Sequence, residues 1–203
     1  MELLHVLYRE FICQEDARVQ ETMLTVPNLI TALGIIAILI YVLQFLTASF
    51  VYVIPLTVGI AVASDLLDGF AARRLNQHTF SGKLFDALRD RLLRIAVFAN
   101  AIVAASAGKT LEELWPLLIP FAIVLTIEWT TFRTHIGEYH KRKFAKGHKV
   151  TRALQIPAMI LMGLIVVQEY WLPPLMPRAL LLWIIAIIGL VQARYFRYAQ
   201  KNS

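Results

Sequence analysis

The sequence contains little charge and almost no cysteine. Of its 203 residues, 17% are charged and 58% are hydrophobic, and the mean hydropathy is +0.62. Cys13 is the only cysteine, which excludes an intrachain disulfide and a cysteine-based metal cluster. No charged side chain occurs from Leu29 to Ser64, and about 20 apolar residues in a helix are enough to cross a bilayer core. The composition therefore predicts an integral membrane protein rather than an ordinary soluble domain.

The first 22 residues lack the pattern expected of a cleavable signal peptide, because acidic and basic residues are mixed with aliphatic ones. Leu3, Leu4, Leu7 and Phe11 recur at helical spacing. This periodicity predicts an interfacial helix over residues 1–26, lying on the membrane surface, and a docked or mobile arm is the alternative.

Hydropathy predicts an all-α, polytopic membrane protein in which residues 27–203 form one domain of six transmembrane helices. The expected spans are residues 27–47, 52–73, 83–105, 114–134, 150–170 and 178–198.

An even number of spans places both termini on the same side of the membrane. All basic residues except Lys109 and Arg178 then fall on that side, which the positive-inside rule identifies as the cytoplasm. We expect a bacterial-type inner or plasma membrane. The net charge of +6 is explained by this topology and by contact with anionic lipid, so it does not call for a nucleic-acid partner.

Most of the intramembrane charge lies in one stretch, "SDLLDGFAARRLNQHTFSGKLFDALRDR", residues 64–91. Asp65 and Asp68 are three residues apart near the end of the second span, and Asp86 and Asp90 are four apart at the start of the third. Both spacings place side chains on one face of a helix, so the four carboxylates can converge.

Such a cluster needs a cation, because one charge at the bilayer centre costs about 2.5–3.5 kcal/mol even on permissive scales. Hard divalent ions prefer oxygen ligands, and a pair of them is a common device for phosphoryl transfer. The alternative is an ion-pair ladder with Arg73, Arg89 and Arg91 that sets only the helix register.

The fixed residues of this stretch resemble the signature of the CDP-alcohol phosphotransferase family. They are Asp65-x-x-Asp68-Gly69-x-x-Ala72-Arg73, then eight residues, then Gly82-x-x-x-Asp86-x-x-x-Asp90. The resemblance implies a six-helix membrane enzyme, usually a homodimer, that transfers a substituted phosphate from a CDP-linked donor, typically CDP-diacylglycerol, to an alcohol and releases CMP.

The resemblance also implies a role for each position. Asp65, Asp68 and Asp86 correspond to ligands of a divalent pair, Mg²⁺ or Mn²⁺. Asp90 corresponds to the general base and lies near the metals. The remaining signature residues are expected at the nucleotide: Gly69, Ala72 and Gly82 lack bulk and allow close approach, and Arg73 offers a planar cation to a phosphate.

The start of the first span, "TVPNLITALG", also resembles the family, in which an Asn and a Thr face the nucleotide. Asn28 and Thr31 are therefore candidate nucleotide-binding residues. The alternative is a helix cap, since Asn and Thr often precede an apolar run for that reason alone.

The clues to the acceptor alcohol disagree. The branch that makes phosphatidylglycerophosphate or cardiolipin usually has a proline after the third aspartate and a lysine after the fourth, where this sequence has Ala87 and Arg91. The pair Asp90-Arg91 looks more like the branch that uses inositol phosphates. The stretch "GHKVTRALQ" resembles the glycerophosphate branch, although Arg152 replaces its Thr. Lys149 and Arg152 would suit a phosphorylated alcohol, and we expect glycerol 3-phosphate ahead of inositol phosphate.

Two other classes of protein agree less well with the sequence. A transporter would carry polar residues through several helices to the outer face, whereas the outer halves of these spans are almost wholly apolar. A structural or scaffold protein would leave the aspartate spacing without a reason.

Overall fold

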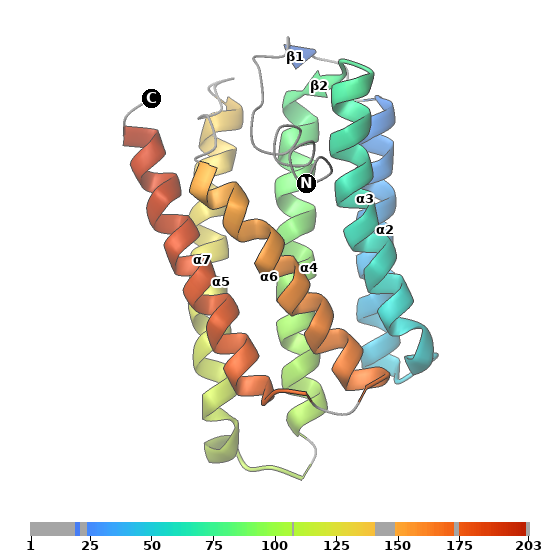
Figure 1. Ribbon diagram of the computed structural model, residues 1–203, viewed down its shortest axis with the longest axis vertical. Helices are drawn as coiled ribbons and strands as arrows, with labels where there is room; N and C mark the ends of the chain where they lie inside the picture. The colour runs from blue at the N-terminus through green and yellow to red at the C-terminus, as the bar shows by residue number, and fades with distance from the viewer. Residues whose placement is uncertain (1–18, 21–23, 107, 141–148, 173–174, 202–203) are drawn as a thin grey trace, which may run out of the picture.

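Six helices make up almost all of the described part of the computed structural model, which comprises residues 19–20, 24–106, 108–140, 149–172 and 175–201 (Figure 1). They are α2 (Val26–Thr47), α3 (Ile54–Arg74), α4 (Phe80–Ser106), α5 (Leu111–His140), α6 (Lys149–Tyr170) and α7 (Arg178–Lys201). Each expected span coincides with one of these helices. The predicted interfacial helix lies almost entirely outside the described residues.

Two short elements accompany the helices. A 3-10 turn, η1 (Val51–Val53), leads into α3, and the two-residue strands β1 (Val19–Gln20) and β2 (His78–Thr79) pair in parallel. The pairing holds the chain before α2 against the turn between α3 and α4. The architecture is all-α apart from this contact among the described residues.

Local chemistry explains where α2 begins and ends. Thr25 adopts an extended backbone, and its side-chain oxygen accepts a hydrogen bond from the Asn28 amide, so Thr25 is the N-cap. Pro27 lies in the first turn, where its missing N–H group costs nothing. Ala48 closes the helix in a left-handed conformation, the usual geometry of a helix C-terminus.

Consecutive helices run in opposite directions, and α6 crosses the bundle obliquely beside α3, α4 and α7 (Figure 1). The core is apolar and includes Ile38, Ile54, Phe98, Ile165 and Leu182, which are all almost inaccessible. Many other large apolar side chains face outward along α2 and α3. This arrangement fits a hydrocarbon environment, in which apolar surface faces both the core and the lipid.

Four described segments are long and apolar enough to cross a membrane: Val26–Thr47, Val51–Arg74, Glu112–Gly137 and Arg178–Tyr195. A shorter apolar stretch, Leu154–Tyr170, belongs to α6. The helix α4 does not qualify because charged residues fill its first half. The protein is an integral membrane protein, and the charge within α4 is the feature that needs a function.

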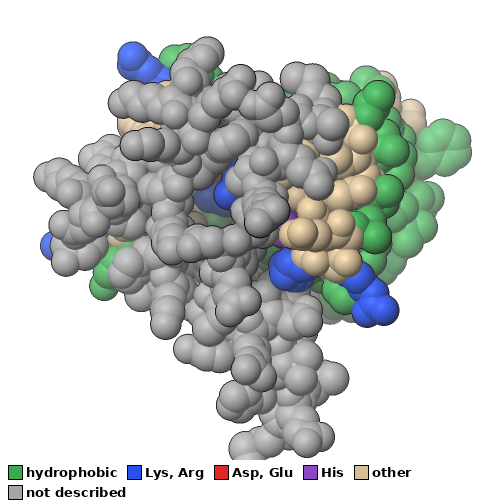
Figure 2. Space-filling view, turned by 90° about the horizontal axis from the view of Figure 1, so that it is seen from above, with side chains coloured by type: hydrophobic (Ala, Val, Ile, Leu, Met, Phe, Trp, Pro, Cys, Tyr) green, Lys and Arg blue, Asp and Glu red, His purple; other side chains and the backbone are tan. Residues whose placement is uncertain are grey.

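The signature stretch lies at one end of the bundle, together with β2, the start of α4 and the end of α7 (Figure 1, top). Figure 2 looks onto this end and shows lysine and arginine side chains around it, with hydrophobic side chains covering an adjoining flank. We call it the signature end.

Candidate active site

The four signature aspartates come together between α3 and α4. Asp65, Asp68 and Asp86 each place a carboxylate oxygen within 4.8 Å of those of the other two. The fourth, Asp90, reaches the same point through a shared partner, Arg89. The two faces predicted from the spacing therefore do converge, and we call these four side chains the aspartate quartet.

Arg89 lies at the centre of the quartet. Its two terminal nitrogens donate to Asp65, Asp68 and Asp86, and to Oδ1 of Asp90 at 3.0 Å. The arginine is only 1% exposed, so it is fully committed to these contacts. The alternative of an ion-pair ladder is therefore partly correct, because Arg89 pairs with carboxylates on both α3 and α4.

The oxygen-rich donor set fits a hard divalent cation. Three carboxylates within 4.8 Å of one another match what Mg²⁺ or Mn²⁺ prefers. Asp86 is the most exposed of the three, since its side chain is 47% exposed, whereas that of Asp68 is 8% exposed.

Thr31 supports the quartet from α2. Its hydroxyl donates to Oδ2 of Asp68 at 2.6 Å, and both residues are buried. Thr25, not Thr31 or Asn28, caps this helix. The cap alternative is therefore wrong for Thr31, which positions a signature carboxylate.

Asn28 joins α2 to the turn before α4. Its side-chain amide nitrogen lies 3.1 Å from the Thr79 hydroxyl. A Cβ atom at Gly82 would come within 2.4 Å of the Asn28 side-chain oxygen and 2.7 Å of the Thr79 hydroxyl. Gly82 is thus required by packing inside the protein, a reason separate from the nucleotide contact expected for it.

Gly34 is a second position at which packing requires glycine, and nothing in the sequence indicated this. A Cβ atom there would lie 2.1 Å from Ser64 Oγ and 2.9 Å from Arg89 Cδ. The absence of a side chain on α2 therefore makes room for the stem of Arg89. Gly69 differs, because a Cβ would meet only the Arg73 guanidinium at ordinary contact distance.

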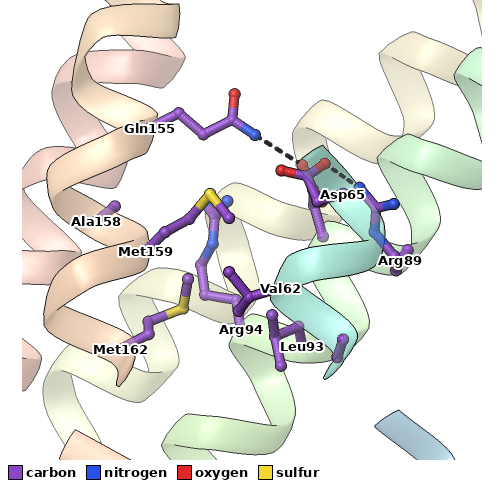
Figure 3. A pocket seen from close by; sticks show the side chains of 11 residues that line it. Val62, Asp65, Arg89, Leu93, Arg94, Gln155, Ala158, Met159 and Met162 are labelled. Atoms are coloured by element: carbon purple, nitrogen blue, oxygen red, sulfur yellow. Dashed lines mark hydrogen bonds and ion pairs between the residues drawn. The ribbon is translucent and has the colours of Figure 1, made fainter. Parts of the chain in front are cut away.

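A recess opens beside the quartet toward α6 (Figure 3). Gln155 donates its side-chain amide to Oδ2 of Asp90 at 3.0 Å, and Met159 and Met162 lie farther along the same helix. Arg94 also lines the recess, and its buried Nε has no hydrogen-bond partner among the described residues. Gln155 and Arg94 were not predicted, although Gln155 ends the motif "KVTRALQ".

Arg91 and Arg94 face Glu128 of α5. The buried Glu128 carboxylate lies 2.6 Å from Arg94 and 3.5 Å from Arg91. Arg91 also stacks over the Phe132 ring at 5.5 Å. Arg91 therefore joins α4 to α5, which weakens its value as a clue to an inositol-type acceptor.

The other predicted positions lie on the helices that surround the quartet. Ala72 and Arg73 lie in the last turns of α3, partly exposed. Lys149 and Arg152 lie in the first turns of α6, and their side chains are outside the part of the chain that is described.

The far end of the bundle is more polar than expected. Tyr170 donates to Asn100 at 2.7 Å, and Arg178 pairs with the buried carboxylate of Glu169. Gln168 donates to the Met176 carbonyl. These groups pair with one another near the helix ends, and the apolar core lies between them and the quartet.

The structure is a helical bundle of membrane-protein type in which four carboxylates converge at one end, a donor set that could hold a divalent cation. The family model for CDP-alcohol phosphatidyltransferases matches residues 24–192. The chain belongs to this family.

One curated relative is a CDP-diacylglycerol–glycerol-3-phosphate 3-phosphatidyltransferase from Pseudomonas fluorescens. It is 36% identical over 104 residues, which cover 50% of this chain and 50% of the relative. The match thus spans about half the length of that protein. No solved structure gives a significant match.

Proposed function

We propose that this protein transfers the phosphatidyl group from CDP-diacylglycerol to glycerol 3-phosphate and releases CMP. The observation that carries the proposal is the convergence of Asp65, Asp68 and Asp86 at a point that Asp90 also reaches. Family membership supports the reaction type, and the matched relative is named for this acceptor.

All six helices are proposed to cross the membrane, α4 with its charged half at the cytoplasmic side. The signature end is then cytoplasmic, because it carries most of the basic residues. The charge within α4 is tolerated there because the carboxylates and arginines pair with each other inside the bundle. By family resemblance the working unit is a homodimer.

Asp65, Asp68 and Asp86 would hold the divalent pair, Mg²⁺ or Mn²⁺, which neutralises charge on pyrophosphate oxygens when bound. Thr31 orients Asp68 through its hydrogen bond. We assign nucleotide contacts to Asn28, Thr31, Gly69, Ala72, Arg73 and Gly82.

Asp90 is the proposed general base. Its carboxylate takes the proton from the acceptor hydroxyl as the new phosphorus–oxygen bond forms, and the bond to CMP breaks. Gln155 holds Oδ2 of Asp90 at 3.0 Å. This hydrogen bond holds the Asp90 carboxylate beside the recess, and the acceptor is proposed to approach from that side.

An apolar groove of about 300 Å³ between α3 and α6 is the proposed site for an acyl chain of the donor. It is lined by Pro55, Val58 and Gly163, among others, and shares Val62 and Met159 with the recess. A lipid tail in the groove would thus lead its headgroup toward the quartet.

Cations near the recess favour a phosphorylated acceptor. Arg94 lines the recess itself, and Lys149 and Arg152 begin the helix that carries Gln155. A phosphate monoester offers these cations charge-assisted hydrogen bonds, whereas a neutral alcohol does not.

The test is purified protein supplied with Mg²⁺, CDP-diacylglycerol and a panel of alcohols, with lipid products identified by mass spectrometry. Phosphatidylglycerophosphate should dominate, and CMP should appear in equal amount. An unphosphorylated alcohol as the best acceptor would contradict the assignment, and inositol phosphate as the best would place the protein in the other branch.

Lys149→Ala and Arg152→Ala test the acceptor contacts separately. Each should lower catalytic efficiency for glycerol 3-phosphate by roughly 10- to 150-fold, the range expected from losing one charge-assisted contact. The requirement for CDP-diacylglycerol should change little. Unchanged acceptor saturation in both variants would remove these residues from the site.

A further inference from the structure

Arg89 has an unusual position for a residue outside the family signature. Its guanidinium contacts all four members of the quartet, and its side chain is 1% exposed. The room for its stem comes from Gly34 on the neighbouring helix, where a Cβ would approach Arg89 Cδ to 2.9 Å. The fold is thus shaped around this arginine.

The contacts of Arg89 involve carboxylate oxygens that a divalent cation also needs. Oδ2 of Asp68 already accepts from both Thr31 and Arg89, and Oδ1 of Asp90 accepts from Arg89. A guanidinium and a metal ion cannot both occupy the centre of the same carboxylates, because the two cations repel each other at that distance.

We propose that Arg89 is a resident counter-ion that holds the quartet together without metal and must leave the carboxylates when a divalent cation binds. The inference rests on the proposed metal site. It makes Arg89 a positioning residue with two opposed effects: it stabilises the metal-free protein, and it weakens metal binding by competition.

The physical reason for the first effect is the cost of unpaired charge. Four carboxylates within a membrane bundle repel one another, and Arg89 is the described cation that contacts all of them. The second effect follows because any ion that binds must first replace these hydrogen bonds.

Arg89→Gln is the most informative variant, because glutamine removes the charge but keeps two amide donors for the carboxylates. In chelator, its melting temperature should fall by about 6–20 °C, the shift expected from breaking a buried ion pair in a protein of this size. Its affinity for Mn²⁺, measured by electron paramagnetic resonance on protein in detergent, should rise by roughly tenfold or more.

Arg74→Gln is the matched control. It removes the same charge from the signature end, but Arg74 is exposed. Neither the melting temperature in chelator nor the affinity for Mn²⁺ should therefore change. If Arg89→Gln does not fold, Arg89→Lys replaces it; its compact ammonium should give smaller shifts in the same two directions.

Equal or weaker Mn²⁺ binding by the Arg89 variant would overturn the inference, as would an unchanged melting temperature in chelator. Asp86→Asn separates this result from failure of the metal site. If Mn²⁺ binding depends on Asp86 but is unchanged in the Arg89 variant, only the role of Arg89 is refuted. If neither the unaltered protein nor any variant binds Mn²⁺, both the metal assignment and this inference are refuted.

Discussion

The four aspartates share a location but not an environment. Asp68 is the most buried and is held by Thr31, whereas Asp86 is the most open. Asp90 alone contacts Gln155 on α6. At the scale of single residues, these neighbours distinguish the proposed metal ligands from the proposed base.

Asp65→Asn, Asp68→Asn and Asp86→Asn should each lower turnover by about 100- to 1,000-fold, as loss of one electrostatic stabiliser typically does. An amide cannot supply the charge that a divalent ion requires. The measurement is CMP release with and without added Mn²⁺. Glu112→Gln, which changes an exposed carboxylate on α5, should be unaffected, and full activity of the three variants in chelator would refute the ligand roles.

Asp90→Asn should lower turnover by about 100- to 10,000-fold, the range for a general base, yet leave CDP binding intact. A base acts in the chemical step rather than in ground-state binding of the donor. Equilibrium binding of CDP, compared with Asp86→Asn, provides the readout. A parallel loss of CDP affinity and turnover would make Asp90 a metal ligand instead.

The sequence predicted which carboxylates meet but not what lies between them. Helical spacing alone places Asp65 with Asp68 and Asp86 with Asp90. The position of Arg89 depends on a side-chain conformation and on space left by Gly34, and neither is visible in a linear pattern. The hydrogen bond from Gln155 to Asp90 could not be predicted either, because the two residues are far apart along the chain.

At the scale of helices, α2 and α3 approach closely where Gly34 faces Ser64. Hydropathy predicted all six helices because each carries a long apolar run or a regular apolar face. It could not predict the pairing of β1 with β2, because two residues carry no periodicity. Nor could it predict the polar contacts at the far end, since Asn100 and Tyr170 lie on different helices.

Gly34→Ala should destabilise the protein by about 1–3 kcal/mol, the usual cost of overpacking. The added methyl group would collide with Ser64 and press on Arg89. Thermal unfolding in detergent measures the effect. Gly59→Ala is the control, because a Cβ there meets nothing within 4 Å, and a loss of stability as large as that of Gly34→Ala would show that the collision is not the cause.

At the scale of the whole molecule, the proposed topology places the turn before α4 in the cytoplasm and the turn after α4 outside. Because Cys13 is the only cysteine, a Cys13→Ser background permits single labelling sites at exposed positions. A membrane-impermeant maleimide should label Lys109→Cys on intact cells and Arg74→Cys only after permeabilisation. The reverse pattern would invert the topology.

Aromatic side chains mark the end opposite the aspartates. Tyr52 and Trp171 are exposed, and the Trp171 ring nitrogen donates to the Tyr52 carbonyl at 2.8 Å; tyrosine and tryptophan favour the membrane–water boundary. At about 1.5 Å per residue, the helix from Tyr52 to Asp65 rises roughly 20 Å. In a hydrocarbon layer of about 30 Å, Asp65 then lies below the opposite headgroups. The rate of the reaction should therefore depend on bilayer thickness, because in a thicker bilayer the donor phosphates lie farther from the carboxylates.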